Sequence, residues 1–389
     1  MKYYLKSKEI YVEDEILNDY YLLIKDGKIE RVEKNKSEDL EIIELGDLNI
    51  IPGLVDLHIH GADGYDVMDG NYEALNNMSL YLSKNGVTSF LATTLTAPLD
   101  KVKKALVNVK ESMEKGLEGA EVLGSYLEGP YLTEEYKGAH PVEFMRKVSL
   151  NEIKKLIDSS EDTIKVVTIA PEKENSLEIV EYLKNRGIKT SIGHTNATYD
   201  ETMDAIEKGA SIGVHTFNGM RGLHHREPGV VGAIMDSDKI YGELISDNIH
   251  VNPAVMRILY KLKGKDKLYL ITDCMMAGGL DDGEYQLGEL KVNVKDSIAR
   301  TESGSLAGST LKLKNGIKNI MNACDIDLFE GLKLATIIPA KALGIDRNIG
   351  SIREGKRANL TVIDDDLNIY MTIVNGKIVY RKNEGSNKK

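Results

Sequence analysis

Cysteine, long apolar runs and an excess of positive charge are all missing from this sequence. Only Cys274 and Cys324 occur among 389 residues, so we expect no disulfide framework and a reducing cytoplasm. No run approaches the roughly 20 apolar residues of a membrane-spanning helix, and residues 1–6 lack the apolar stretch of a secretory signal. The net charge of −11 disfavours nucleic acid and anionic membranes as partners, because such a chain repels phosphate polymers.

The overall composition is that of an ordinary globular protein. Hydrophobic residues make up 42% of the chain and charged residues 29%, which is typical of a folded protein rather than a disordered or fibrous one. A length of 389 residues is more than one hydrophobic core usually supports. We therefore expect one large domain and a smaller one.

The two ends of the chain predict small β-structures. Residues 20–25 and 28–32 are strand-like runs joined by Asp26-Gly27, which is a strong hairpin signal. Near the C-terminus, residues 358–364 predict a strand and residues 371–380 a second hairpin. The polar residues 383–389 predict a frayed tail. Neither piece is large enough to be stable alone. We expect them to form one β-sandwich domain of residues 1–52 plus 345–389.

The middle of the chain, residues 53–344, predicts a barrel. Eight short apolar runs alternate there with helical stretches, at residues 55–60, 89–94, 122–128, 166–170, 189–194, 211–215, 241–246 and 268–273. Strands that alternate with helices form a parallel sheet, and eight of them suggest a closed (β/α)8 barrel of the TIM type.

Metal-type side chains stand at the ends of several of these runs. The first run ends in His58-Ile59-His60, and the two-residue period of a strand turns both imidazoles to the same side. Four further residues of this kind end other runs: Glu128, His194, His215 and Asp273. In such barrels the active site lies at the C-terminal ends of the strands, so these six residues predict one site.

This residue set indicates hydrolytic metal chemistry. Imidazole and carboxylate ligands without a cysteine cluster suit a divalent zinc, iron, manganese or cobalt ion that keeps one position open. Such an ion lowers the pKa of bound water to near neutral and generates hydroxide beside a substrate carbonyl. We assign to Asp273 the transfer of the proton from this water to the leaving nitrogen.

Several motifs resemble those of a known family, the N-acetylglucosamine-6-phosphate deacetylases of the amidohydrolase superfamily. The resemblance covers nearly the whole chain, at residues 52–61 (PGLVDLHIHG), 127–131 (LEGPY), 137–141 (KGAHP), 193–197 (GHTNA), 215–220 (HTFNGM), 225–229 (HREPG), 272–273 (TD) and 306–309 (LAGS). The His-x-His element marks only the superfamily. The elements at 127–131, 137–141 and 225–229 are specific to the deacetylases.

The resemblance implies roles for the metal-type residues. It makes Glu128, His194 and His215 the ligands of a principal metal, of which zinc and iron are the first choices. His58 and His60 are similar to the ligands of a second metal, which Glu128 would bridge. Some family members lack these two histidines and use a single ion, so one ion and two ions are both open.

The resemblance also implies substrate contacts. His140 resembles the residue that polarises the acetyl carbonyl, and Asp273 resembles the catalytic acid and base. The expected contacts to a phosphorylated sugar are Asn218, the backbone N–H of Gly219, Arg226, His250, Leu306 and Ala307. In this family Arg226 and His250 can come from a neighbouring subunit, which implies a homodimer.

Departures from the family pattern are few. Asn248 and Asn252 flank His250 where glycine and histidine are more usual, and Cys274 follows Asp273 where alanine is common. None of them removes a reacting group. His224 is read as a loop residue, whereas for His225 a structural and a functional role both stay open.

The reaction that the resemblance implies is hydrolysis of the acetamide of N-acetyl-D-glucosamine 6-phosphate, by metal-bound hydroxide, to D-glucosamine 6-phosphate and acetate. Two other amidohydrolase reactions are the alternatives: deacetylation of the galactosamine epimer and deacylation of an N-acylamino acid. A sugar-phosphate sensor without catalytic activity is the rival from another class of protein.

Overall fold

An eight-stranded parallel sheet forms the centre of the molecule in the computed structural model, which describes residues 1–382. The strands follow one another in chain order: β8 (Leu54–Ile59), β11 (Val87–Thr94), β12 (Glu121–Leu127), β13 (Ile164–Ile169), β14 (Lys189–Ile192), β15 (Ala210–Gly213), β16 (Tyr241–Ile245) and β17 (Leu268–Ile271). Each coincides with one of the eight predicted runs. The predicted barrel is therefore confirmed.

The sheet closes between its first strand and the residues that follow its last one. The backbone N–H of Asp273 donates to the carbonyl of His58 at 2.9 Å, and the N–H of His60 donates to the carbonyl of Cys274 at 2.9 Å. Below this seam the buried Asp56 carboxylate accepts the hydroxyl of Thr272 at 2.6 Å. The closure thus brings His58, His60 and Asp273 to the same rim.

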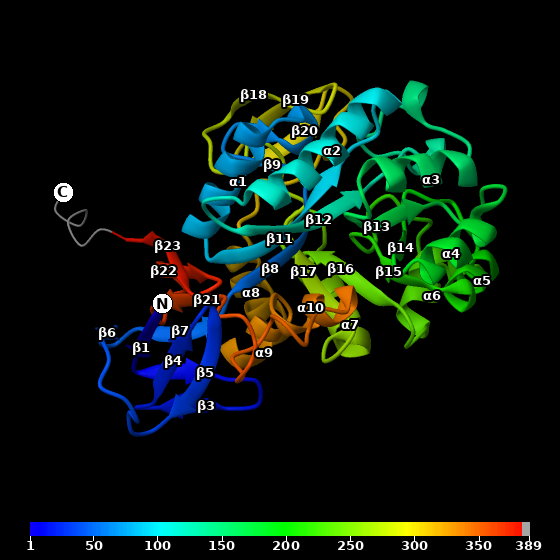
Figure 1. Cartoon of the computed structure of the whole chain (residues 1–389). Helices are drawn as coiled ribbons and strands as arrows, with labels where there is room; N and C mark the ends of the chain where they lie inside the picture. The colour runs from blue at the N-terminus through cyan, green and yellow to red at the C-terminus, as the bar shows by residue number, and fades with distance from the viewer. Residues whose placement is uncertain (383–389) are drawn as a thin grey trace.

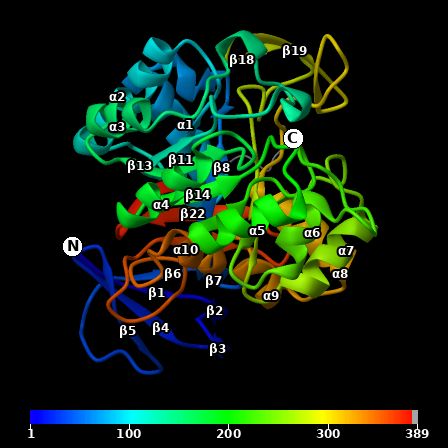
Figure 2. The same cartoon turned by 90° about the vertical axis from the view of Figure 1, so that its right-hand side faces the viewer.

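Helices cover the outside of the barrel (Figures 1 and 2). They are α1 (Tyr72–Lys84), α2 (Leu99–Lys115), α3 (Leu150–Ser159), α4 (Ser176–Asn185), α5 (Tyr199–Lys208), α6 (Gly229–Asp236), α7 (Pro253–Lys263), α8 (Leu313–Cys324), α9 (Leu328–Lys333) and α10 (Ile337–Leu343). In α2 the buried Val102, Ala105, Leu106 and Val109 recur at the spacing of one helix face. No helix within residues 1–382 combines the length and the apolar character needed to cross a membrane.

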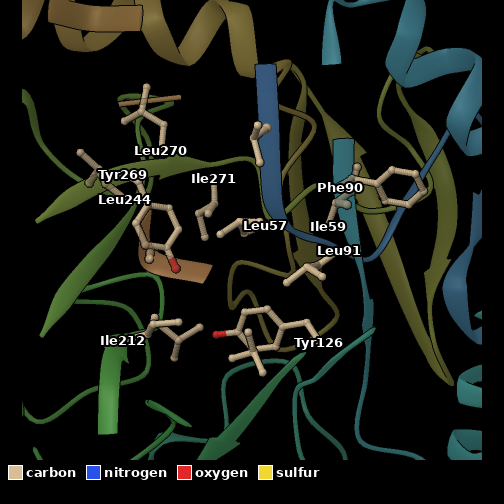
Figure 3. Close-up of a cluster of buried hydrophobic side chains, with 14 of the residues drawn as sticks. Leu57, Ile59, Phe90, Leu91, Tyr126, Ile212, Leu244, Tyr269, Leu270 and Ile271 are labelled. Atoms are coloured by element: carbon tan, nitrogen blue, oxygen red, sulfur yellow. The ribbon is translucent and has the colours of Figure 1, made fainter. Parts of the chain in front are cut away.

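The barrel interior is packed with large side chains rather than hollow. Figure 3 shows Tyr126, Ile212 and Tyr269 from three different strands meeting in one cluster. The hydroxyls of Tyr126 and Tyr269 are directed into this cluster (Figure 3). A filled interior confines any ligand site to the ends of the strands.

Strands from both chain ends lie side by side in a small β-sandwich (Figure 1). One sheet has the order β5-β4-β1-β6 and the other the order β23-β22-β21-β7-β2-β3. Apolar residues such as Leu5, Ile24, Ile50 and Ile373 form a core that both sheets share. The strands are β1 (Lys2–Lys6), β2 (Glu9–Tyr11), β3 (Ile16–Asn18), β4 (Tyr21–Lys25), β5 (Lys28–Glu33), β6 (Ile42–Glu44), β7 (Asn49–Pro52), β21 (Leu360–Ile363), β22 (Ile369–Val374) and β23 (Lys377–Arg381).

The predicted hairpins are present in this sandwich, as β4 pairs with β5 and β22 pairs with β23. The domain limits, residues 1–52 plus 345–389 and residues 53–344, stay a prediction. The frayed tail predicted for residues 383–389 lies outside the described residues.

A three-stranded antiparallel sheet between β17 and α8 was not predicted. It consists of β18 (Gly283–Leu287), β19 (Leu290–Lys295) and β20 (Ile298–Thr301), and it lies at the top of Figure 1. Leu287, Val292, Val294 and Ala299 pack with Leu95 in a separate apolar cluster. Shorter elements complete the chain: β9 (Gly61–Ala62), β10 (Tyr65–Asp66), η1 (Val67–Asp69), η2 (Glu134–Tyr136) and η3 (Val142–Phe144).

Candidate metal and active site

The predicted metal-type residues converge on the C-terminal rim of the barrel, but most stand just beyond the strands. Glu128 follows β12 directly, and His194, His215 and Asp273 each lie two residues past a strand end. The last three have φ angles of 48°, 25° and 50°, in the left-handed region that side chains other than glycine rarely adopt. Such backbone costs about 1–3 kcal/mol per residue and is concentrated at functional sites.

Glu128, His194 and His215 form the first group of potential ligands. Glu128 Oε1 lies 3.3 Å from His194 Nε2 and 3.0 Å from His215 Nε2. The two imidazole nitrogens are 3.1 Å apart. One ligand atom from each residue therefore faces a common point, and all three side chains are buried.

His58, His60 and Asp273 form the second group, beside the other oxygen of Glu128. Asp273 Oδ1 lies 3.6 Å from His58 Nε2 and 3.2 Å from His60 Nε2. Glu128 Oε2 lies 3.5 Å from His58 Nε2 and 3.1 Å from His60 Nε2. Glu128 thus presents one carboxylate oxygen to each group.

Both groups fit a divalent metal ion. Within each group the potential ligand atoms lie within 4.8 Å of one another. His58 Nε2 is buried and has no hydrogen-bond partner among the described residues, although two carboxylates face it. A buried nitrogen without a partner is costly unless something else occupies it. Nitrogen and carboxylate donors of this kind suit zinc, iron, manganese or cobalt.

The carboxylates and imidazoles strongly perturb each other's pKa. Burial opposes ionisation of Glu128, but the charge of His58 and hydrogen bonds from the other histidines lower its pKa well below the usual range. Burial likewise disfavours the charged form of His60, yet hydrogen bonds to Asp273 and Glu128 raise its pKa to about 9. For Asp273 the histidines outweigh burial and lower the pKa to about 2. The site therefore favours ionised carboxylates beside positively charged groups.

Backbone carbonyls orient two of the imidazoles. His194 Nδ1 lies 2.9 Å from the carbonyl of Tyr136, and His215 Nδ1 lies 3.0 Å from the carbonyl of Asn218. A carbonyl can only accept, so each Nδ1 carries the proton and each Nε2 presents its lone pair to the site. This arrangement is typical of histidines that bind metals.

His140 faces Glu128 from a loop rather than from a strand. Its Nε2 lies 3.5 Å from Glu128 Oε2, and its Nδ1 lies 2.8 Å from the hydroxyl of Thr96. Burial and the neighbouring His194 lower the pKa of His140 to about 4, so this imidazole is neutral near pH 7. It is placed to donate a hydrogen bond to an oxygen in the site.

A cavity of about 240 Å³ opens over the two groups. Asn218, Gly219, His250 and Leu306 line it together with His140 and most of the potential metal ligands. No lysine or arginine is among the described residues that line it.

Two predicted substrate contacts lie outside the lining of this cavity. Arg226 is exposed on the loop between β15 and α6, where its Nη1 lies 2.6 Å from His225 Nε2. Ala307 is fully buried, and its N–H donates to the carbonyl of Ala299 at 3.1 Å. His224 is exposed in the same loop as Arg226, as the loop interpretation expected.

Sequence reasoning missed two residues in contact with the site. Thr96 holds His140, as described above, and Glu243 lies in the middle of β16 with its carboxylate 3.1 Å from His58 Nδ1. A glutamate inside the otherwise apolar run 241–246 was a signal that could have identified Glu243. The run 89–94 ends before Thr96, and nothing in the sequence marks that residue.

The chain also matches known proteins over most of its length. The model of the amidohydrolase family matches residues 49–379. An N-acetylglucosamine-6-phosphate deacetylase of Vibrio furnissii is 43% identical over 87% of this chain and 85% of its own. An N-acetylgalactosamine-6-phosphate deacetylase of Escherichia coli O157:H7 is 38% identical over 97% of this chain and 99% of its own.

Solved structures agree with these relatives. The crystal structure of an N-acetylglucosamine-6-phosphate deacetylase from Pasteurella multocida superposes with a TM-score of 0.93 at 34% identity, covering 98% of this chain and 100% of that one. Such similarity extends over the barrel and the terminal sheets together. The chain therefore belongs to the amidohydrolase family, and within it to the group that contains the N-acetylhexosamine 6-phosphate deacetylases.

Proposed function

We propose that this enzyme hydrolyses the acetamide of N-acetyl-D-glucosamine 6-phosphate to D-glucosamine 6-phosphate and acetate. The observation that carries the proposal is the convergence of Glu128, His194 and His215 with Asp273 and His140 around one small cavity. The relatives with this activity, which match most of the chain, support the same substrate.

The residues divide the chemistry among them. A divalent ion, when bound, supplies a water of lowered pKa and polarises the acetyl carbonyl. Asp273, whose low pKa keeps it ionised, accepts the proton of the attacking water and delivers it to the amine that leaves. His140, neutral and hydrogen-bonded to Thr96, donates to the carbonyl oxygen as negative charge develops there.

The identity and number of the metal ions are part of the proposal. Zinc or iron suits the nitrogen and carboxylate donors best, and manganese and cobalt are accepted by the same set. We propose that Glu128, His194 and His215 hold the principal ion. We propose that His58, His60 and Asp273 hold a second ion, with Glu128 as the bridge, because Glu128 turns one oxygen toward each group.

We further propose that the sugar phosphate is bound by residues from two subunits of a homodimer. Asn218, the N–H of Gly219 and His250 line the cavity of one chain, and Leu306 packs beside them. The cavity lacks lysine and arginine among its described lining residues, whereas a phosphate needs a cation. Arg226 is exposed and free of carboxylate contacts among residues 1–382, so it can reach a neighbouring subunit. His250 lines its own cavity, which favours a contact within the same chain.

The galactosamine epimer is the second candidate substrate. The Escherichia coli O157:H7 relative, named for that epimer, matches almost the entire chain. Both epimers carry the same acetamide and phosphate, so the metal groups and Asp273 serve either one. A cytoplasmic location stays a prediction that rests on the two free cysteines.

An acetate-release assay on metal-loaded protein tests these proposals. It compares the 6-phosphates of both epimers with unphosphorylated N-acetylglucosamine and with an N-acylamino acid. We expect rapid release from one or both sugar phosphates and slow release from the other two compounds. Equal rates with and without phosphate would contradict the phosphate site. Release from none of the compounds, with the sugar phosphate still bound, would support a sensor instead.

A further inference from the structure

Glu243 is a buried carboxylate that the mechanism above does not use. It lies at the centre of β16, where the other residues are mostly apolar, and its side chain is fully buried. Burying an ionised carboxylate costs several kcal/mol unless close partners compensate it. A hydrophobic residue would fill this position in the barrel core at no such cost. A buried carboxylate at this position is therefore expected to have a specific role.

The partners of Glu243 come from three other barrel segments. Its Oε2 lies 3.1 Å from His58 Nδ1 and accepts the backbone N–H of His215 at 3.2 Å. Its Oε1 accepts the hydroxyl of Tyr269 at 2.8 Å. One oxygen of Glu243 thus contacts one residue from each of the two metal groups.

His58 is the imidazole for which this contact matters most. Hydrogen bonding to a carboxylate places the proton on Nδ1, so the lone pair of Nε2 is free to bind an ion beside Glu128 and Asp273. His60 lacks a comparable support, because its Nδ1 is buried without a hydrogen-bond partner among the described residues. His194 and His215 have only neutral carbonyls behind them.

We propose that Glu243 is a positioning residue that sets the affinity of the second metal ion through His58. It binds neither substrate nor metal. It holds the His58 ring in one tautomer and orientation and raises the basicity of Nε2. This inference rests on the proposed metal-dependent function, and it deepens that function by naming a residue that controls occupancy of the second position.

The contact with His215 predicts a smaller effect on the first ion. The N–H that Glu243 accepts belongs to a residue with a φ of 25°, so the bond helps to hold an unfavourable backbone conformation. The imidazole of His215 is oriented independently by the carbonyl of Asn218. Loss of the Glu243 charge should therefore weaken the second ion more than the first.

A metal titration of the metal-free protein tests the proposal without any activity measurement. Wild-type protein, Glu243→Gln and Tyr269→Phe are titrated with Co²⁺ and Zn²⁺ by calorimetry, and the visible cobalt spectrum follows each ion. We expect two ions in wild type, and in Glu243→Gln a 10- to 100-fold weaker second ion. Tyr269→Phe leaves the carboxylate on His58, so its second ion should bind nearly as in wild type.

Thermal unfolding of the metal-free variants separates positioning from a merely structural role. A structural role would lower the melting temperature of Glu243→Gln and leave the ratio of the two affinities unchanged, which would overturn the proposal. Binding of only one ion by wild type would overturn it too. If Glu243→Gln fails to fold, Glu243→Asp replaces it, with a smaller loss in the same direction expected. Acetate release by wild type is assayed separately, so a failure of the proposed reaction can be distinguished from a failure of the proposal for Glu243.

Discussion

His140 Nδ1 lies 2.8 Å from the hydroxyl of Thr96 and 3.4 Å from the backbone N–H of the same residue. An amide N–H can only donate, so Nδ1 accepts and the ring proton resides on Nε2. This nitrogen faces the cavity, 3.5 Å from Glu128 Oε2. Thr96 therefore selects the tautomer in which His140 can donate to a substrate carbonyl.

The first prediction concerns this donor. His140→Ala should lower kcat by about 100- to 1000-fold, because one hydrogen bond to the developing oxyanion is lost. Metal content, measured by elemental analysis, should stay that of wild type. Thr96→Val should lower kcat less, because the backbone N–H still favours the same tautomer. A normal kcat in His140→Ala would rule out carbonyl polarisation by this residue.

The second prediction concerns the proton carrier. Asp273→Asn should lower kcat by about 100- to 10,000-fold, since an amide cannot accept the proton of the attacking water. Binding of the sugar phosphate, measured by calorimetry, should persist because the residues proposed to contact the phosphate are unchanged. Near-normal turnover of this variant would show that another group moves the proton.

Most of the barrel could be predicted because its strands bury both faces and so appear as short apolar runs. The exact ends of three strands could not be predicted. His194, His215 and Asp273 end the corresponding apolar runs, but their φ angles are positive and they are not in strand conformation. Their chemical type predicted that they meet at one rim even though the predicted strands were two residues too long. Which side chains gather at the rim was thus more predictable than their backbone conformation.

Other features could not be predicted because they depend on contacts between distant segments. The sheet of β18–β20 packs on Leu95 and Ala139, which are far away in the chain. The contacts of Glu243 form only once β16 lies between β15 and β17 in the closed barrel. Arg226 lies outside the cavity of its own chain because of the conformation of its loop. Hydrophobic periodicity in a sequence does not indicate the conformation of a loop.

The third prediction is a pH dependence of stability at Lys263. This lysine ends α7, is 4% exposed, and donates to the carbonyls of Ser237 and Ile240. Burial lowers the pKa of Lys263 from 10.5 to about 8 in the folded chain. Between these two values the unfolded chain binds the proton and the folded chain has released it. Stability therefore rises with pH in this window.

Lys263→Met isolates this contribution, because methionine carries no titratable group. The free energy of urea unfolding is measured at pH 8, 9 and 10 for both proteins in their metal-free form. The difference, wild type minus variant, should increase with pH by at most about 1.4 kcal/mol per pH unit. A difference that is flat or decreases over this range would contradict the depressed pKa.

The fourth prediction is that Arg226 acts on the site of a neighbouring subunit. Arg226→Ala should raise KM for the 6-phosphorylated sugar and leave turnover of the unphosphorylated sugar almost unchanged, because only the phosphate loses a partner. Lys239→Ala removes another exposed cation, whose one ion pair within residues 1–382 is with Glu207, so this variant serves as the control and should behave as wild type.

Mixing two impaired variants decides whether the contact crosses the interface. In a heterodimer of Asp273→Asn and Arg226→Ala, the subunit with alanine at position 226 keeps its own Asp273 and receives Arg226 from its neighbour. One site per heterodimer is then complete, so unfolding and refolding the mixture should restore activity well above that of either variant alone. If Arg226 served its own chain, no site in the heterodimer would contain both residues, and the mixture would stay as slow as its components. A gel-filtration profile at the mass of a monomer would exclude the shared site before any mixing.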